Sequence, residues 1–283
     1  MRIRIIYISL LLLLLTFKGS AAKPLAVIEL GTHPGGTYMM TMKATVNGTE
    51  GLFMFDMGGG VSYVSPDFAK SVGCTPWGQI TGFMLTGQRL DMPRCDALTF
   101  EVEGRRLAAP TAGVFDIGQF MPKDAPRIDG SIGLDVFAGQ TVTLSLAEKK
   151  LTVESPKTFS ARIKNAKEVP IRLVREAEGL ALSVVVAVPT SKGNAWMELD
   201  SGNGGANVVG RHLASIMSLD PEKKEPQSAG VQIAGGIPVD GMFRVNPTLT
   251  MDGNIGTRFL INWDLTLDLA NGRAWLARAN AKP

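Results

Sequence analysis

Two short stretches decide the fold: residues 53–58 read FMFDMG, and residues 196–202 read WMELDSG. Each is an apolar run that ends in an Asp-x-Gly turn, and further glycines follow both turns. A strand fixes the backbone that carries the aspartate, and glycine allows a sharp turn directly after it. Each stretch is therefore predicted to present one carboxylate, Asp56 or Asp200, from a tight turn at the end of a buried strand.

A second pair of matching segments lies downstream of the first. Residues 129–133 read DGSIG and residues 252–256 read DGNIG, and the match continues beyond them without a gap. Two elements that recur in the same order indicate an internal duplication. We predict two related lobes, residues 23–156 and 169–283, joined by a linker at residues 157–168.

The rest of the sequence is rich in strand and turn signals. Residues 38–46 form an extended run that ends at Asn47-Gly48, a strong hairpin signal. Residues 141–146 and 265–269 alternate in the period of two that is typical of strands. Long helical periodicity is absent, and one short helix is predicted after Ser65, an N-cap residue that precedes a proline. The predicted fold class is all-β.

Residues 1–22 have the features of a secretory signal peptide. Arg2 and Arg4 precede an apolar run over residues 5–17, and small residues lie before a cleavage point after Ala22. The alternative is a membrane anchor, but the apolar run is shorter than the ~20 residues that span a bilayer. We therefore predict export to the periplasm or out of the cell, with no stable membrane anchor after cleavage.

Charge and histidine content exclude several function classes. Three of the 29 basic residues lie in the leader, which leaves 26 against 26 acidic residues in the rest of the chain. Because no cluster of Lys and Arg remains, a nucleic-acid-binding surface is not predicted. The two histidines, His33 and His212, are far apart, and no Cys/His group has ligand spacing. Neither a metal nor another cofactor is predicted.

The sequence contains two cysteines, Cys74 and Cys95. Export permits a disulfide, and an even number leaves no unpaired thiol. Two buried free thiols are the alternative. We predict a disulfide that ties the end of the short helix to a later strand and closes a loop of about 20 residues.

A pseudo-two-fold relation between the lobes would bring Asp56 and Asp200 face to face. Two adjacent carboxylates cannot both ionise easily, so one keeps its proton while the other accepts protons. Such a pair can activate a water and protonate a leaving amide. The alternatives are weaker: the glycine clusters lack the Gly-Lys-Ser/Thr ending of a phosphate loop, and Ser62 and Ser201 lack a Gly-x-Ser-x-Gly nucleophile motif.

With these motifs the chain, from about Lys43 to Leu276, resembles the pepsin/retropepsin-like aspartic peptidases, in particular the two-lobed bacterial retropepsin-like proteins. The resemblance implies a duplicated acid-protease barrel with a central cleft, a monomer without cofactor, and Asp56 and Asp200 as the catalytic pair. It also implies supporting and substrate-binding residues. The loop supports are Met57, Gly58, Ser201, Gly202, Ile132, Gly133, Ile255 and Gly256, and the flap residues are Phe83, Met84, Thr86, Gly235, Gly236 and Ile237.

One position departs from the family pattern. Met57 stands where the family has Thr or Ser, whose hydroxyl braces the two loops, and a thioether cannot donate a hydrogen bond. Because Ser201 is retained, the loop that carries Asp56 is expected to be held less rigidly than the loop that carries Asp200.

Two functions follow: an exported aspartic endopeptidase acting on peptides or proteins, or a weak or inactive peptide-binding protein that uses the same cleft. A homodimer of half-sites ranks last because the duplication supplies both halves.

Overall fold

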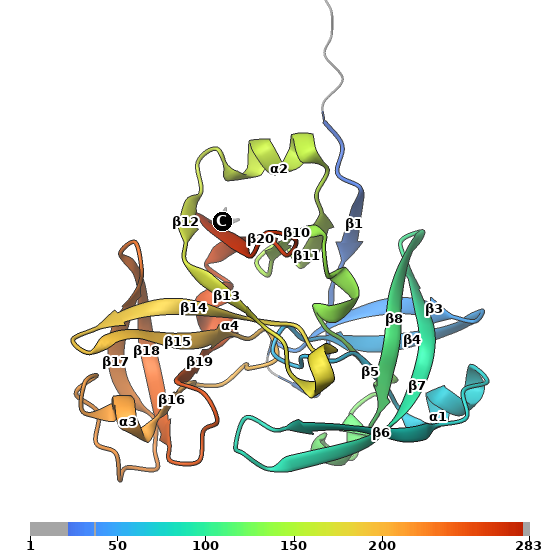
Figure 1. Cartoon of the computed structure of the whole chain (residues 1–283), viewed down its shortest axis with the longest axis horizontal. Helices are drawn as coiled ribbons and strands as arrows, with labels where there is room; N and C mark the ends of the chain where they lie inside the picture. Colours follow the sequence, from blue (N-terminus) through green and yellow to red (C-terminus); the bar gives the residue numbers. More distant parts are fainter. Residues whose placement is uncertain (1–21, 37, 280–283) are drawn as a thin grey trace, which may run out of the picture.

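The computed structural model describes residues 22–36 and 38–279, and β-strands grouped in three sheets are the main secondary structure of this part of the chain (Figure 1). The prediction of an all-β, two-lobed fold is confirmed. The predicted signal peptide lies outside the described residues, apart from Ala22. Within the described ranges, no helix is long and apolar enough to cross a membrane.

The first lobe is built on an eight-stranded sheet, at the right of Figure 1. A further pairing between β3 and β7, at Thr45 and Glu101, closes six of its strands into a barrel. In sheet order the strands are β2 (Gly31–Thr32), β3 (Met40–Val46), β4 (Thr49–Phe55), β9 (Gly130–Ile132), β5 (Tyr63–Val64), β8 (Arg105–Val114), β7 (Arg89–Val102) and β6 (Trp77–Phe83).

The second lobe repeats the centre of this arrangement in a seven-stranded sheet, at the left of Figure 1. Its strands in sheet order are β13 (Ile171–Val174), β14 (Ser183–Thr190), β15 (Gly193–Leu199), β19 (Gly253–Ile255), β16 (Asn207–Gly210), β18 (Ile237–Asn246) and β17 (Gln227–Ile233). The order β4-β9-β5-β8 in the first lobe corresponds to β15-β19-β16-β18 in the second. The duplication seen in the sequence therefore includes this four-strand unit.

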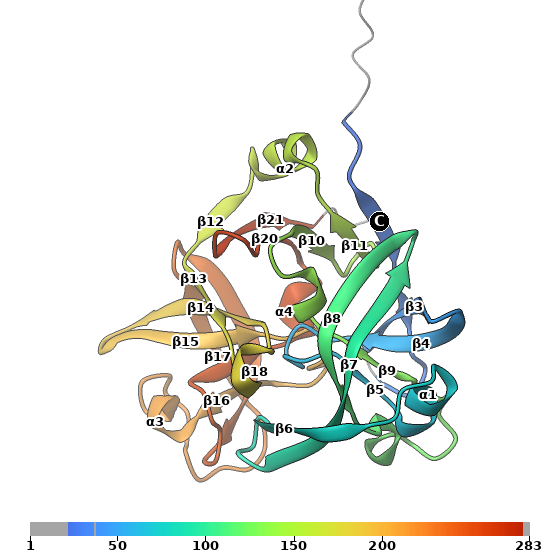
Figure 2. The ribbon, with the colours of Figure 1, turned by 45° about the vertical axis from the view of Figure 1, so that its right-hand side comes forward.

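A third sheet joins the two lobes and was not predicted as a separate unit. In order its strands are β1 (Ala26–Glu29), β11 (Lys150–Val153), β10 (Thr141–Ser145), β20 (Trp263–Asp268), β21 (Arg273–Arg278) and β12 (Lys167–Val169). At its centre β10 and β20 pair antiparallel with Thr143 opposite Thr266, and the two Oγ1 atoms lie 3.0 Å apart. Because these threonines are equivalent in the repeat, the pseudo-two-fold axis passes between them. Figure 2 shows this sheet above both lobes.

Short helices connect the strands. They are α1 (Pro66–Ser71), η1 (Ile117–Phe120), η2 (Asp135–Phe137), α2 (Pro156–Ile163), η3 (Ala177–Gly179), α3 (Arg211–Ala214) and α4 (Thr257–Leu260). Ser65 caps α1 as predicted, accepting a hydrogen bond from the N–H of Phe68. The predicted linker holds α2, which starts with a capping box formed by Ser155 and Thr158. The segment between the lobes is thus ordered by helix capping and then continues into the shared sheet.

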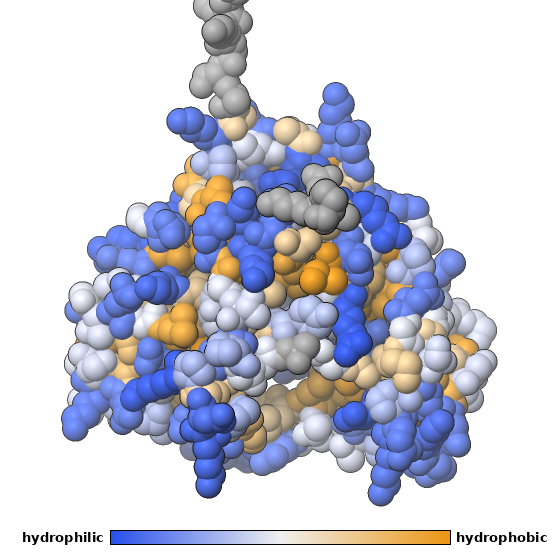
Figure 3. All heavy atoms as spheres, turned by 180° about the vertical axis from the view of Figure 1, so that it is seen from behind, coloured by the Kyte–Doolittle hydropathy of each residue, from blue (hydrophilic) through white to orange (hydrophobic). Residues whose placement is uncertain are grey.

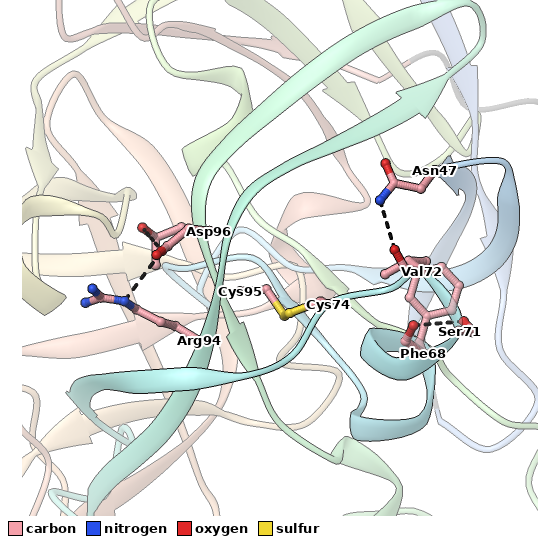
Figure 4. The surroundings of a disulfide bond; sticks show 9 residues. Asn47, Phe68, Ser71, Val72, Cys74, Arg94, Cys95 and Asp96 are labelled. Atoms are coloured by element: carbon pink, nitrogen blue, oxygen red, sulfur yellow. Dashed lines mark hydrogen bonds and ion pairs between the residues drawn. A yellow bond between two sulfur atoms is a disulfide. The ribbon is translucent and has the colours of Figure 1, made fainter.

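An aromatic cluster anchors the first lobe next to the predicted disulfide. Phe53 is fully buried, and its ring meets Phe68 of α1 at 5.2 Å and Phe100 of β7 at 5.3 Å, both edge to face. Cys74, just after α1, is disulfide-bonded to Cys95 on β7, with Cα atoms 6.0 Å apart (Figure 4). The bond therefore fixes α1 against the barrel that carries Asp56.

Removing this disulfide should destabilise the protein. The bond spans 21 residues, and in the chain-entropy model a loop of this length contributes about 3 kcal/mol. We expect the double variant Cys74→Ser/Cys95→Ser to lose about that much unfolding free energy, measured by urea denaturation. Reducing agent should shift wild type by the same amount and leave the double variant unchanged. Wild type that is unaffected by reduction would contradict this role.

Candidate active site

Equivalent strands position Asp56 and Asp200. β4 runs parallel to β9 and β15 runs parallel to β19, so each aspartate follows a strand that is hydrogen-bonded to the Ile-Gly segment of its own lobe. The N–H of Asp56 donates to the carbonyl of Ile132 at 3.1 Å, and the N–H of Asp200 donates to that of Ile255 at 2.9 Å. Both isoleucines are completely buried. The two carboxylates therefore leave their lobes at the same point of the repeated unit.

The two loops approach so closely that only glycine fits beside each carboxylate. A Cβ on Gly58 would lie 2.5 Å from Cγ of Asp200, and a Cβ on Gly202 would lie 2.7 Å from Cγ of Asp56. Real Cβ atoms do not come this close, so a side chain at either position would push the loops apart. Each lobe thus provides the space for the aspartate of the other.

The surroundings of Asp56 favour its protonated form. Burial, followed by the charge of Asp200 and the hydrogen bond between the two carboxyls, raises the pKa of Asp56 well above its usual range. Backbone N–H groups of Gly58 and Gly59 oppose this shift, and the bond from Gly58 to Oδ1 measures 2.9 Å. Desolvation and a neighbouring negative charge both penalise the ionised form, so Asp56 stays neutral beside a charged partner.

Asp200 receives more donors than Asp56. Its Oδ1 accepts from the N–H of Gly202 at 2.6 Å and of Asn203 at 3.2 Å, and its Oδ2 accepts from Nδ2 of Asn254 at 2.7 Å. Hydrogen bonds to a carboxylate favour the charged form. Asp200 is therefore the better hydrogen-bonded member of the pair.

Ser201 braces the opposite lobe, and this corrects the sequence-based expectation. Its Oγ accepts from the N–H of Met57 at 3.0 Å and donates to the carbonyl of Phe55 at 3.3 Å. The hydroxyl therefore holds the loop of Asp56, which was expected to be the looser one. Met57, fully buried, can return no such bond to the second lobe. A hydroxyl at position 57 would face the loop of Asp200, and Met57 provides none.

Several polar residues that were not predicted as loop supports hold the two aspartate loops by hydrogen bonds. The N–H of Gly133 donates to Oγ of Ser62 at 2.9 Å, and the N–H of Gly256 donates to Oδ1 of Asn207 at 3.1 Å, so the two lobes use equivalent bonds. Ser62 Oγ in turn donates to Asp135 at 2.6 Å. Burial raises the pKa of Asp135, while the hydrogen bonds from Ser62 lower it. The repeat could have revealed Ser62 and Asn207, because both follow their aspartate by a short glycine-containing loop.

Tyr63 lies next to this layer and was also missed. It is buried on β5, where it pairs with Ser131 of β9 across the sheet. Burial raises the pKa of Tyr63 above its usual range, so it remains a neutral phenol. It adds a polar but uncharged side chain near the carboxyl pair.

The first predicted flap forms and reaches the second lobe. β6 and β7 make a hairpin whose turn is closed by a bond from the N–H of Gly87 to the carbonyl of Met84. The N–H of Thr250 in the second lobe donates to the carbonyl of Leu85 at 3.3 Å, so the tip of the hairpin contacts the other lobe. Phe83 is 60% exposed. Thr86 is exposed and Met84 half-buried.

The second predicted flap does not take this position. β17 and β18 form the expected hairpin, with its turn at residues 234–236. The N–H of Ala234 donates to the carbonyl of Ala187, and Gly235 lies against the side chain of Lys167 from the shared sheet. Ile237 is buried in the core. Ile237 is therefore a core residue of the second lobe, whereas Gly235 and Gly236 form an exposed turn whose hairpin contacts β14 and β12.

The surface is open between the two lobes. Seen from behind, the space-filling view has an opening at the lower centre with apolar residues beside it (Figure 3). The site thus combines a pair of carboxyl groups with one hairpin that reaches the second lobe. This arrangement can activate a water and donate a proton within one site.

The raised pKa of Asp56 makes a prediction about stability. A carboxyl whose pKa is raised on folding stabilises the protein at pH below about 4, the unfolded value, and this contribution is lost as the pH rises through the folded value. Asp56→Asn should therefore raise the melting temperature at pH 7 and change it little at pH 3. Asp124→Asn, at an exposed position, serves as the control. Equal effects of Asp56→Asn at both pH values would show that the carboxyl is not strained in the fold.

Comparison with known proteins agrees with this geometry. A family model described as aspartyl protease matches residues 42–136, the part of the first lobe that carries Asp56 and the Ile132-Gly133 segment. No curated protein matches the sequence.

Two solved structures share the fold. Basic 7S globulin from soybean has a TM-score of 0.56 at 11% identity, over 90% of this chain and 95% of that chain. Conglutin gamma, a basic 7S globulin from lupine seeds, has a TM-score of 0.57 at 9% identity, over 91% of this chain and 96% of that chain. At such identities the likeness shows the fold alone. The first lobe is thus aspartyl-protease-like in sequence, and the chain as a whole has the two-lobed, pepsin-like fold.

Proposed function

We propose that the protein is an aspartic-type endopeptidase that hydrolyses peptide bonds with a water activated by Asp56 and Asp200. The observation that carries the proposal is the reciprocal approach of the two loops, in which each aspartate occupies the space beside the glycine of the other lobe. If the two aspartates only terminated strands in separate lobes, the two loops would not need to approach each other. The aspartyl-protease match over the first lobe supports the same conclusion.

The hydrogen bonds suggest a role for each aspartate. The carboxylate of Asp200 accepts a proton from the water, whose oxygen attacks the peptide carbonyl carbon, while the neutral Asp56 donates its hydrogen bond to the carbonyl oxygen. The resulting tetrahedral intermediate breaks at its C–N bond when a proton passes from the pair to the leaving nitrogen. The products are a carboxylic acid and an amine, and the pair returns to its starting state with one proton.

The substrate proposed is a peptide or protein segment held extended between the flap and the floor of the site. Exposed Phe83 on the flap offers an apolar contact, and no basic or acidic surface is required. We further propose that the protein acts as a monomer after export, in the periplasm or outside the cell. The sequence of the leader and the presence of both aspartates in one chain support this.

The alternative function is a peptide-binding protein that uses the same cleft with little or no catalysis. Two observations favour it: Met57 leaves the second loop without its cross-lobe hydroxyl, and the two solved structures with the same fold are described as globulins rather than as peptidases. Turnover distinguishes the two functions directly.

The peptidase proposal is tested by incubating the protein with a mixed peptide library from about pH 3 to pH 8. We expect cleavage that falls by about 100- to 10,000-fold in both Asp56→Asn and Asp200→Asn, the range that general acid–base groups contribute. Asp124→Asn should cleave like wild type. Binding of peptides without cleavage at any pH would support the alternative, and cleavage that survives in either active-site variant would exclude the carboxyl-pair mechanism.

Restoring the missing hydroxyl should speed the reaction. In Met57→Thr the new hydroxyl would face the loop of Asp200, and errors of about 1 Å in positioning can cost on the order of 100-fold in rate. We expect a higher kcat together with a lower melting temperature, because loss of a buried Met side chain costs about 2–5 kcal/mol. Met57→Val, matched in size to Thr but without the hydroxyl, separates the two effects. A kcat equal in the Thr and Val variants would show that the hydroxyl is dispensable here.

A further inference from the structure

A third carboxyl lies beside the aspartate pair. Glu198 on β15 is two residues before Asp200, and only 5% of it is exposed. It pairs across the parallel ladder with Asn254, whereas the equivalent pair in the first lobe is Met54 with Ser131. The repeat thus contains an acid and an amide in one lobe where the other has an apolar residue and a small hydroxyl. Burying a carboxyl group costs free energy unless hydrogen bonds compensate. The difference between the two lobes therefore indicates a function for Glu198.

Hydrogen bonds fix the orientation of Asn254. The N–H of Gly205 donates to Oδ1 of Asn203 at 2.9 Å, which directs Nδ2 of Asn203 to Oδ1 of Asn254 at 2.8 Å. Nδ2 of Asn254 then faces both carboxyls, donating to Oε2 of Glu198 at 3.1 Å and to Oδ2 of Asp200 at 2.7 Å. Both donor hydrogens and the acceptor of this amide are therefore used.

This network lies on the side of the site that Met57 leaves without support. Ser201 holds the loop of Asp56 from the second lobe, but the first lobe has no hydroxyl at position 57 with which to hold the loop of Asp200. Asn203 and Asn254 provide contacts to Asp200 from within its own lobe. Glu198 is the acceptor that occupies the second N–H of Asn254, and without it the amide could turn away from Asp200.

We propose that Glu198 is a positioning residue that, through Asn254, holds Asp200 in place and favours its charged form. This rests on the proposed peptidase function of the same site. Glu198 touches neither the reacting water nor the substrate in this proposal. It acts only through the amide that it orients.

The surroundings of Glu198 keep its carboxyl group neutral while it orients Asn254. Asp200 at the end of its own strand and Asp56 at the end of β4 are the titratable groups that raise the pKa of Glu198, while Ser183 on β14 and the amide of Asn254 lower it. Arg172 on β13 lies in the same row of the sheet, but its guanidinium is stacked 3.9 Å from the ring of Trp196. Burial, and then the charge of Asp200, raises the pKa of Glu198 to about 8. Below that pH, glutamine is a close mimic of the neutral acid.

Three variants test the proposal: Glu198→Gln keeps an acceptor for Asn254, Glu198→Met introduces the residue of the first lobe, and Asn254→Ser removes the amide. The readout is the pH profile of kcat/KM, whose acidic limb reports ionisation of the catalytic base. Asn254→Ser should move this limb upward by about 1–2 pH units, equivalent to one hydrogen bond to a charged group. Glu198→Met should move it the same way and lower kcat about tenfold with KM unchanged, whereas Glu198→Gln should keep the wild-type limb.

A second readout separates this inference from the peptidase proposal. Carboxyl-selective ¹³C NMR titration follows Asp200 directly in the same variants, whether or not the protein cleaves peptides. If wild type is inactive but Asp200 titrates at higher pH in Glu198→Met and not in Glu198→Gln, the positioning role stands and the peptidase proposal fails. If Glu198→Met and Glu198→Gln give the same Asp200 titration in folded protein, the positioning role is wrong even if wild type cleaves peptides.

Discussion

The geometry of the site depends on the close contact between the carboxyl groups of Asp56 and Asp200, which repel each other when both are charged. Asp56 and Asp200 are brought together because each loop has a glycine where the carboxyl of the other loop must fit. The repulsion is relieved by a single proton, which burial and the neighbouring charge keep on Asp56. The shared six-stranded sheet, with Thr143 and Thr266 at its centre, fixes the two lobes in the orientation that makes this contact possible.

The two halves of the site are stabilised in different ways, although the duplication makes them equivalent in backbone. Ser201 crosses the interface and holds the backbone around Met57, whereas Asp200 is held by Gly202, Asn203 and Asn254 of its own lobe. Loss of a cross-lobe hydroxyl is thus accompanied by a polar network within one lobe. This asymmetry also assigns the charge, since the carboxylate with more donors is the one that ionises more readily.

The two-lobed all-β fold and the pairing of Asp56 with Asp200 were predictable from the sequence, because both depend on short motifs that occur twice. The shared sheet was harder to predict, since the pairing of β10 with β20 joins Thr143 to Thr266, 123 positions later in the chain. The second hairpin was misassigned because a glycine-rich turn has the same pattern whether it covers a cleft or packs on a neighbouring strand, as Gly235 does on Lys167. The direction of the Ser201 bond and the role of Glu198 depend on tertiary contacts that no local pattern contains.

The central claim is that the two aspartates share one proton and that Asp56 holds it. Neutron diffraction from deuterated crystals at about pH 6 locates such a proton directly. The account predicts one deuteron between the two carboxyls, bonded to an oxygen of Asp56 and directed toward Asp200. Two bare carboxylates separated by solvent, or a deuteron bonded to Asp200 with Asp56 charged, would contradict it.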